Sequence, residues 1–288
     1  MSTLRDWFSL VRFSHSVFAL PFALCGAWLA GGGRPSWSAL AAIVICAVAA
    51  RTAAMAFNRL VDRRIDAENP RTRAREIPAG RVRVGEVRLL IALASAAFVA
   101  CAFTLNTLSG WLTFPVLAWL FAYSYFKRFS ALAHFALGGA LALAPLGAWI
   151  AVRGQIDGDL APVLWLALAV LTWVAGFDLI YACQDVDFDR RAGLYSIPAR
   201  YGVGAALAAS AASHAVTVAS LAMVGVSADL GWIYWLALVL ATAMLVWEHA
   251  IVRPSDLSRV DTAFFTINGW IGIGLFLGVA LDRGLLAG

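Results

Sequence analysis

The chain has 288 residues, of which 62% are hydrophobic and 14% are charged, and its net charge is +5. Soluble domains carry about 25% charged residues, so this composition excludes a soluble globular protein. The four cysteines lie within or at the ends of apolar runs and show no metal-ligand spacing, which indicates reduced packing residues.

Nine apolar segments follow one another along the chain. A run of about 20 apolar residues crosses the hydrocarbon core as a helix, which satisfies its own backbone hydrogen bonds in lipid. The runs lack the alternation of membrane-barrel strands. The sequence therefore predicts an all-α fold, a polytopic bundle of nine transmembrane helices around a central cavity, as a single domain over residues 1–288. The expected spans are 14–32, 38–61, 86–104, 108–126, 132–152, 161–183, 203–224, 229–252 and 262–282.

The basic residues predict the orientation of these spans. With a cytoplasmic N-terminus, most arginines and the single lysine, Lys127, fall on the cytoplasmic side, whereas Arg34, Arg153 and Arg283 fall on the opposite side. We therefore expect an integral protein of the bacterial inner membrane. Its N-terminus and its two long loops, after the second and sixth spans, would be cytoplasmic.

The second span ends in a polar stripe formed by Asn58, Asp62 and Asp66. Their spacing of four places them on one helix face, about 6 Å apart along the axis. The sixth span ends with Asp185 and Asp189, again four residues apart. Stacked carboxylates repel one another and are costly near a membrane, and a divalent cation removes both penalties.

Oxygen ligands without nearby histidine or cysteine favour Mg²⁺, which usually binds one or two carboxylates together with substrate phosphates. The two acidic clusters, expected at the same membrane face, therefore predict two magnesium sites that hold one diphosphate. A single interfacial aspartate is often merely solvated, but this explanation does not account for two spaced clusters that are each followed by a basic loop.

Basic side chains accompany the acidic clusters. Arg71 follows the first cluster, and the pair Lys127 and Arg128 follows the fourth span. Arginine binds phosphate through two parallel hydrogen bonds. Arg51 lies within the second span, seven residues before Asn58 and on the same face, and an arginine inside a membrane indicates a partner or ligand. The excess of basic residues in cytoplasmic loops explains the outermost arginines by itself. It does not explain why the arginines closer to the acidic clusters alternate with carboxylates.

Together these motifs resemble the UbiA superfamily of intramembrane prenyltransferases, over essentially the whole chain. The stretch from Asp178 to Pro198 is similar to the quinone-biosynthesis branch, the 4-hydroxybenzoate polyprenyltransferases. The resemblance implies transfer of a polyprenyl chain from its diphosphate to a small aromatic acceptor, in ubiquinone or menaquinone biosynthesis, within membrane lipid and without nucleic acid. It implies Mg²⁺ bound by Asn58, Asp62, Asp66, Asp185 and Asp189, catalysis by the four aspartates of this set, and diphosphate binding by Arg51, Asn58, Arg71, Lys127 and Arg128.

Several alternatives stay open at this point. Arg75 is followed by Glu76, where many members of the superfamily have proline, and this resembles a sub-branch that uses futalosine-derived acceptors. Glycerol-lipid or haem-precursor acceptors are further possibilities, and a membrane transporter is the alternative from another class. Transport predicts charges at mid-membrane in several spans, and only Arg51 and Asp178 qualify. Asp185 and Asp189 are the preferred candidates for the base that removes the ring proton of the acceptor, and Asp178 is a weaker candidate.

Overall fold

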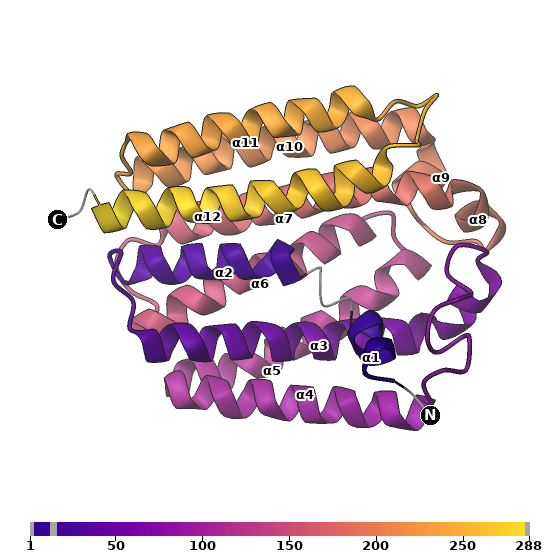
Figure 1. The fold of residues 1–288 in the computed structure, drawn as a ribbon, viewed down its shortest axis with the longest axis horizontal. Coiled ribbons are helices and arrows are strands. Elements are labelled where there is room, and N and C mark those ends of the chain that lie inside the picture. The colour runs from indigo at the N-terminus through magenta and orange to yellow at the C-terminus, as the bar shows by residue number, and fades with distance from the viewer. Residues whose placement is uncertain (1–2, 12–15, 286–288) are drawn as a thin grey trace.

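The computed structural model describes residues 3–11 and 16–285, and all of its long elements are helices (Figure 1). The elements are α1 (Leu4–Leu10), α2 (Ser16–Ala30), α3 (Trp37–Glu68), α4 (Val84–Leu105), α5 (Thr107–Ala122), the 3-10 helix η2 (Tyr123–Arg128), α6 (Ala133–Arg153), α7 (Ala161–Ala182), η3 (Cys183–Asp185), α8 (Val186–Arg191), α9 (Ile197–Tyr201), α10 (Val203–Ser227), α11 (Trp232–Ile251), the π-helical turn η4 (Thr262–Ile267) and α12 (Asn268–Leu285).

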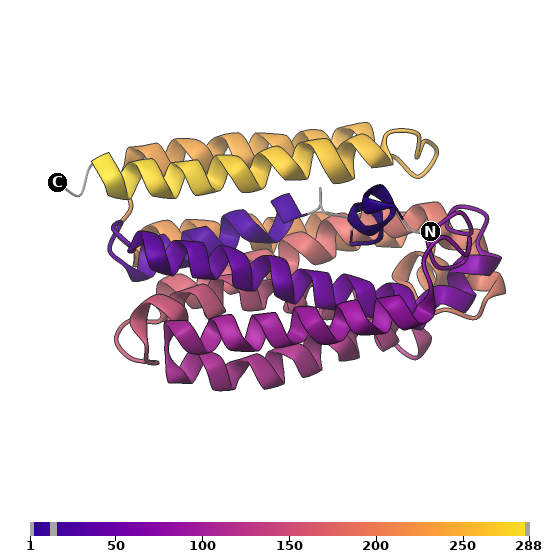
Figure 2. The ribbon, with the colours of Figure 1, turned by 60° about the horizontal axis from the view of Figure 1, so that its bottom comes forward.

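The long helices run along one common axis, and the irregular segments gather at the ends of the bundle (Figures 1 and 2). The loop between α3 and α4 and the short helices α8 and α9 lie at the same end in both views. The loop follows the first acidic motif, and α8 carries Asp189 of the second, so both motifs lie at one end of the bundle. The all-α membrane fold expected from the sequence is confirmed.

The count of nine spans is not exact. Within the described residues, seven helices are long and apolar enough to cross a membrane. The expected spans 14–32 and 108–126 form the shorter helices α2, with 15 residues, and α5, with 16 residues. At 1.5 Å per residue these two helices are about 22–24 Å long, less than the roughly 30 Å of a hydrocarbon core. The chain continues from α5 directly into η2, so the helical stretch is longer than α5 alone.

The central helix of the bundle is α7, the most buried of the long spans, whereas α4 is the least buried. Trp173 on α7 packs against Phe22 and Phe177 with ring centroids 4.9 Å away in each case. Gly138 brings α6 close to α7, because a Cβ there would collide with the carbonyl oxygen of Leu171. Small residues commonly permit such close helix approaches in membranes. The close packing fixes α7, and therefore the acidic motif that follows it.

Candidate active site

One wall of the site is α3, which continues without interruption to Glu68. Its unbroken hydrogen bonding holds Arg51, Asn58, Asp62 and Asp66 on one face, as the spacing predicted, and all four line the same polar chamber. Asp62 and Asp66 are only 2% and 4% exposed. The stripe therefore faces inward into the bundle.

The opposite wall comes from α7 and the short helices that follow it. Asp178 lies on α7, Asp185 ends η3, and Asp189 lies on α8. All three line the chamber that the α3 stripe also lines. Asp189 accepts a hydrogen bond from Ser196 at 2.8 Å. The two acidic motifs thus face one shared space.

The basic residues pair with the acidic motifs. Arg71 donates from Nε to Asp185 Oδ1 at 2.9 Å and from Nη2 to Oδ2. Lys127 Nζ lies 2.5 Å from Asp62 Oδ2, and Arg128 Nη2 lies 3.1 Å from Asp62 Oδ1. Burial alone would lower the pKa of Arg71, but the bonds to Asp185 outweigh it and raise this pKa above its usual range.

Eight of the nine residues expected at the site line the chamber, and Arg128 does not. They are Arg51, Asn58, Asp62, Asp66, Arg71, Lys127, Asp185 and Asp189. Besides Asp62, Arg128 binds the carbonyl oxygen of Val61 at 3.0 Å. Its contacts make it a residue that holds Asp62 in place from outside the chamber.

The donor atoms suit a divalent cation that is shared with a ligand. Oδ2 of Asp66 is buried and accepts no hydrogen bond from the described residues, and Arg59 Nη1 lies 4.0 Å from it. Within the described part of the chain, no three His, Cys, Asp or Glu side chains gather closely enough to hold a metal by themselves. This donor set fits Mg²⁺, which typically relies on few carboxylates and on substrate phosphates.

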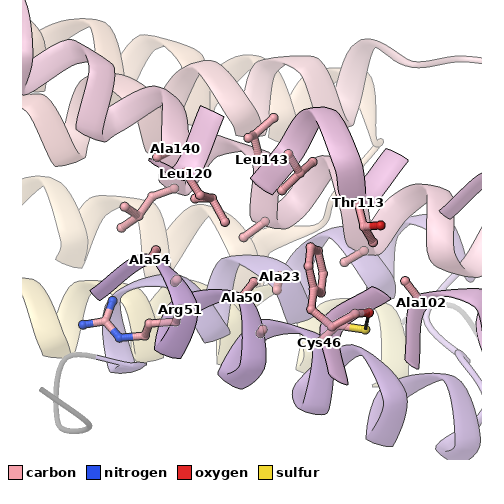
Figure 3. Close-up of a pocket in the computed structure, with 18 of the residues that line it drawn as sticks. Ala23, Cys46, Ala50, Arg51, Ala54, Ala102, Thr113, Leu120, Ala140 and Leu143 are labelled. Atoms are coloured by element: carbon pink, nitrogen blue, oxygen red, sulfur yellow. Dashed lines mark hydrogen bonds between the residues drawn. The ribbon is translucent and has the colours of Figure 1, made fainter. Parts of the chain in front are cut away.

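A second, apolar cavity adjoins the polar chamber. Its walls come from α2 to α6 and are mostly alanine, leucine and other apolar side chains. Arg51 lies at one end of this cavity, and Ala102 and Thr113 lie at the other (Figure 3). The residues that line both spaces are Arg51, Met55, Tyr123, Leu137 and Leu141. A long apolar tail with a charged head matches this pair of spaces.

The sequence did not indicate several contacts that complete the chamber. Arg75 binds Asp66 Oδ1 at 2.7 Å, and Asn69 donates to Asp185 Oδ1 at 3.0 Å. His134 Nδ1 lies 2.7 Å from Asp178 Oδ2. Arg75 and Asn69 belong to the polar, arginine-rich loop after the second span, so the composition of that loop pointed to their region. His134 and Asp178 are 44 residues apart and share no motif.

Glu76, the departure from the common pattern, does not line the chamber. It accepts a hydrogen bond from Ser9 at 2.5 Å, and Arg81 lies 3.6 Å from it. Arg81 also binds Asp6 at 3.0 Å. These contacts fasten α1 to the loop between α3 and α4. Glu76 therefore anchors this loop from outside the chamber.

Comparison with known proteins agrees with this geometry. The model of the UbiA prenyltransferase family matches residues 19–270. A 4-hydroxybenzoate octaprenyltransferase from Marinobacter nauticus is 34% identical over 284 residues, which cover 97% of this chain and 95% of that protein.

Solved structures are similar as well. The apo structure of a UbiA homolog from Aeropyrum pernix has a TM-score of 0.84 and 36% identity and covers 93% of this chain and 98% of that one. A UbiA homolog from Archaeoglobus fulgidus bound to GPP and Mg²⁺ shares the fold, with a TM-score of 0.73, 19% identity, and coverage of 96% and 99%. The chain is therefore an integral membrane prenyltransferase that belongs to the UbiA family.

Proposed function

We propose that the protein transfers a polyprenyl chain from polyprenyl diphosphate to 4-hydroxybenzoate, as a Mg²⁺-dependent step of ubiquinone biosynthesis. The observation that carries the proposal is the polar chamber joined to an apolar cavity, because the donor has the same two-part chemistry. The acceptor is taken from the relatives, which are 4-hydroxybenzoate octaprenyltransferases. The positive-inside distribution supports an inner-membrane location with the chamber open to the cytoplasm.

The chamber residues divide into two groups in this proposal. Mg²⁺, when bound, neutralises charge that develops on the departing diphosphate. The oxygens that would hold it belong to Asn58, Asp62, Asp66, Asp185 and Asp189. The donors that would bind or support the diphosphate are Arg51, Asn58, Arg71, Lys127 and Arg128, the last through Asp62.

The protein positions the charged groups around the diphosphate and excludes water from the reacting carbon. Preorganised cations stabilise a leaving diphosphate more effectively than water does, because they need no reorganisation during the reaction. The allylic carbocation that remains reacts with any water nearby, so the space next to it must exclude water. Phe18, Val174, Phe177 and Phe264 supply an apolar wall to the chamber. The ring of the acceptor would then be the available nucleophile.

The test uses the purified protein in lipid nanodiscs with geranyl diphosphate, 4-hydroxybenzoate and Mg²⁺, and detects the product by mass spectrometry. We expect a prenylated acceptor that disappears with a chelator and returns when Mg²⁺ is restored. Asp185→Asn should abolish the product, whereas Asp187→Asn, a change at an exposed position between Asp185 and Asp189, should not. Donor binding without product, for short and long donors alike, would overturn the acceptor assignment.

A further inference from the structure

His134 and Asp178 form a pair that the roles assigned above do not use. His134 is the second residue of α6, and Asp178 lies on α7. Nδ1 of His134 lies 2.7 Å from Oδ2 of Asp178, and both residues line the polar chamber. The histidine side chain is 6% exposed and the aspartate side chain 24%. The histidine is therefore enclosed, and the carboxylate reaches the chamber.

A backbone contact of His134 indicates which nitrogen carries the proton in the neutral ring. The backbone N–H of Ile197, at the start of α9, donates to Nε2 of His134 at 3.5 Å. A nitrogen that accepts a hydrogen bond carries no proton in neutral imidazole, so Nδ1 is the protonated nitrogen. Nδ1–H therefore donates to Asp178 Oδ2. This arrangement orients the carboxylate and leaves it as an acceptor.

Asp178 differs from three of the other four carboxylates of the chamber; the fourth, Asp189, accepts a hydrogen bond from Ser196 and is one of the proposed Mg²⁺ ligands. Asp62, Asp66 and Asp185 each bind a lysine or arginine, and their side chains are 3%, 6% and 17% exposed. Asp178 is held by a histidine, and its exposure is higher than theirs. It also lies seven residues before Asp185 on the way into the bilayer, about 10 Å along a helix. On α7 it directly follows Phe177 and lies one turn after Val174, two residues of the apolar wall.

We propose that Asp178 is the base that takes the ring proton of the aromatic acceptor and that His134 is its positioning residue. This inference rests on the proposed function. The bond between the allylic carbon and the diphosphate oxygen breaks, and its electron pair leaves with the diphosphate. A ring carbon of the acceptor supplies the electron pair of the new carbon–carbon bond. The ring C–H bond then breaks, its electrons restore aromaticity, and the proton passes to Asp178 Oδ1.

The first experiment compares wild type with Asp178→Asn, using 4-hydroxybenzoate and its ring-deuterated form. Loss of a general base typically lowers a rate by about 10²–10⁴-fold, so kcat should fall by about that factor while KM for the donor stays unchanged. Deprotonation becomes the slow step in the variant. We therefore expect a primary deuterium isotope effect that is larger in the variant than in wild type.

Further variants separate chemistry from folding. Asp178→Glu keeps a carboxylate and should recover part of kcat with a smaller isotope effect than Asp178→Asn. His134→Ala should lower kcat less than Asp178→Asn, and His134→Asn, which keeps a donor near Nδ1, should recover part of the loss. Mg²⁺-dependent binding of geranyl diphosphate should persist in all four variants and serves as the folding control.

Three outcomes would contradict the inference in different ways. Full activity of Asp178→Asn overturns the assignment of the base. A slow Asp178→Asn enzyme with no increase in the isotope effect assigns Asp178 to an earlier step. A wild-type enzyme that binds the donor but prenylates no aromatic acceptor overturns the proposed function and the inference with it.

Discussion

Arg71 donates hydrogen bonds to Asp185 from two nitrogens of its guanidinium, and its third nitrogen donates to the hydroxyl of Tyr181 at 2.7 Å. The guanidinium also lies over the Tyr181 ring, 4.9 Å from its centroid. This cluster ties the loop that follows α3 to the end of α7. The two elements that carry the acidic motifs are thereby held together directly.

We expect Arg71→Ala to lower kcat/KM for the donor by about 10–100-fold, since a hydrogen bond to a charged group contributes about 1.5–3 kcal/mol. The variant loses both the clamp on Asp185 and a cation for the diphosphate. Steady-state kinetics in nanodiscs measures the change. Arg73→Ala is the matched control, because Arg73 is exposed on the same loop. Equal losses in the two variants would mean that only the overall charge of the loop matters.

Asp66→Asn should raise the Mg²⁺ concentration needed for half-maximal activity by at least about tenfold, the scale on which changes around metal sites usually act. The buried Oδ2 of Asp66 is the oxygen that the substitution removes as a charged ligand. A Mg²⁺ titration at saturating donor measures the shift. Glu68→Gln removes an exposed carboxylate at the end of the same helix and should leave the titration unchanged. An unaltered Mg²⁺ requirement in Asp66→Asn would exclude Asp66 as a ligand.

Ala102→Phe should select against long donors. Ala102 lines the apolar cavity at the end away from Arg51, so a larger side chain shortens the space for the tail (Figure 3). We expect kcat/KM for octaprenyl diphosphate to fall more than that for geranyl diphosphate, by about tenfold or more for 1–3 kcal/mol of overpacking. Ala100→Phe places the same ring at an exposed position of α4 and is the control. Parallel losses for both donors would show that the tail does not extend to Ala102.

Gly138→Ala should destabilise the bundle, because the added Cβ would collide with the carbonyl oxygen of Leu171 and push α6 away from α7. A backbone atom cannot rotate aside, so we expect a cost of about 1–3 kcal/mol. Thermal unfolding in detergent measures it. Gly147→Ala on the same helix meets nothing within 4 Å and should leave the midpoint unchanged or slightly higher. Equal midpoints for the two variants would rule out tight α6–α7 packing.

The sequence was most informative where function depends on spacing along one helix. Asn58, Asp62 and Asp66 line the chamber together because a regular helix repeats every 3.6 residues, and this repeat is independent of the rest of the fold. The membrane fold followed from hydrophobic length in the same way. The count of spans was less exact, since α2 and α5 end sooner than their apolar runs.

The contacts between helices were not accessible from spacing. His134 meets Asp178 because α6 and α7 pack closely beside each other, and an isolated histidine carries no sign of this partner. The family resemblance assigned Lys127 and Arg128 to the diphosphate, and the structure shows that both also pair with Asp62. Charge in a sequence identifies what a residue attracts, and only the tertiary arrangement identifies which partner is within reach.

The shared wall of Arg51, Met55, Tyr123, Leu137 and Leu141 has a kinetic consequence. A donor whose head enters one space and whose tail enters the other remains a component of the bilayer until it binds. The enzyme therefore encounters it by diffusion in two dimensions. Its rate should follow the mole fraction of donor among the lipids, so adding inert phospholipid would slow the reaction even when the amount of donor per volume of solution is constant.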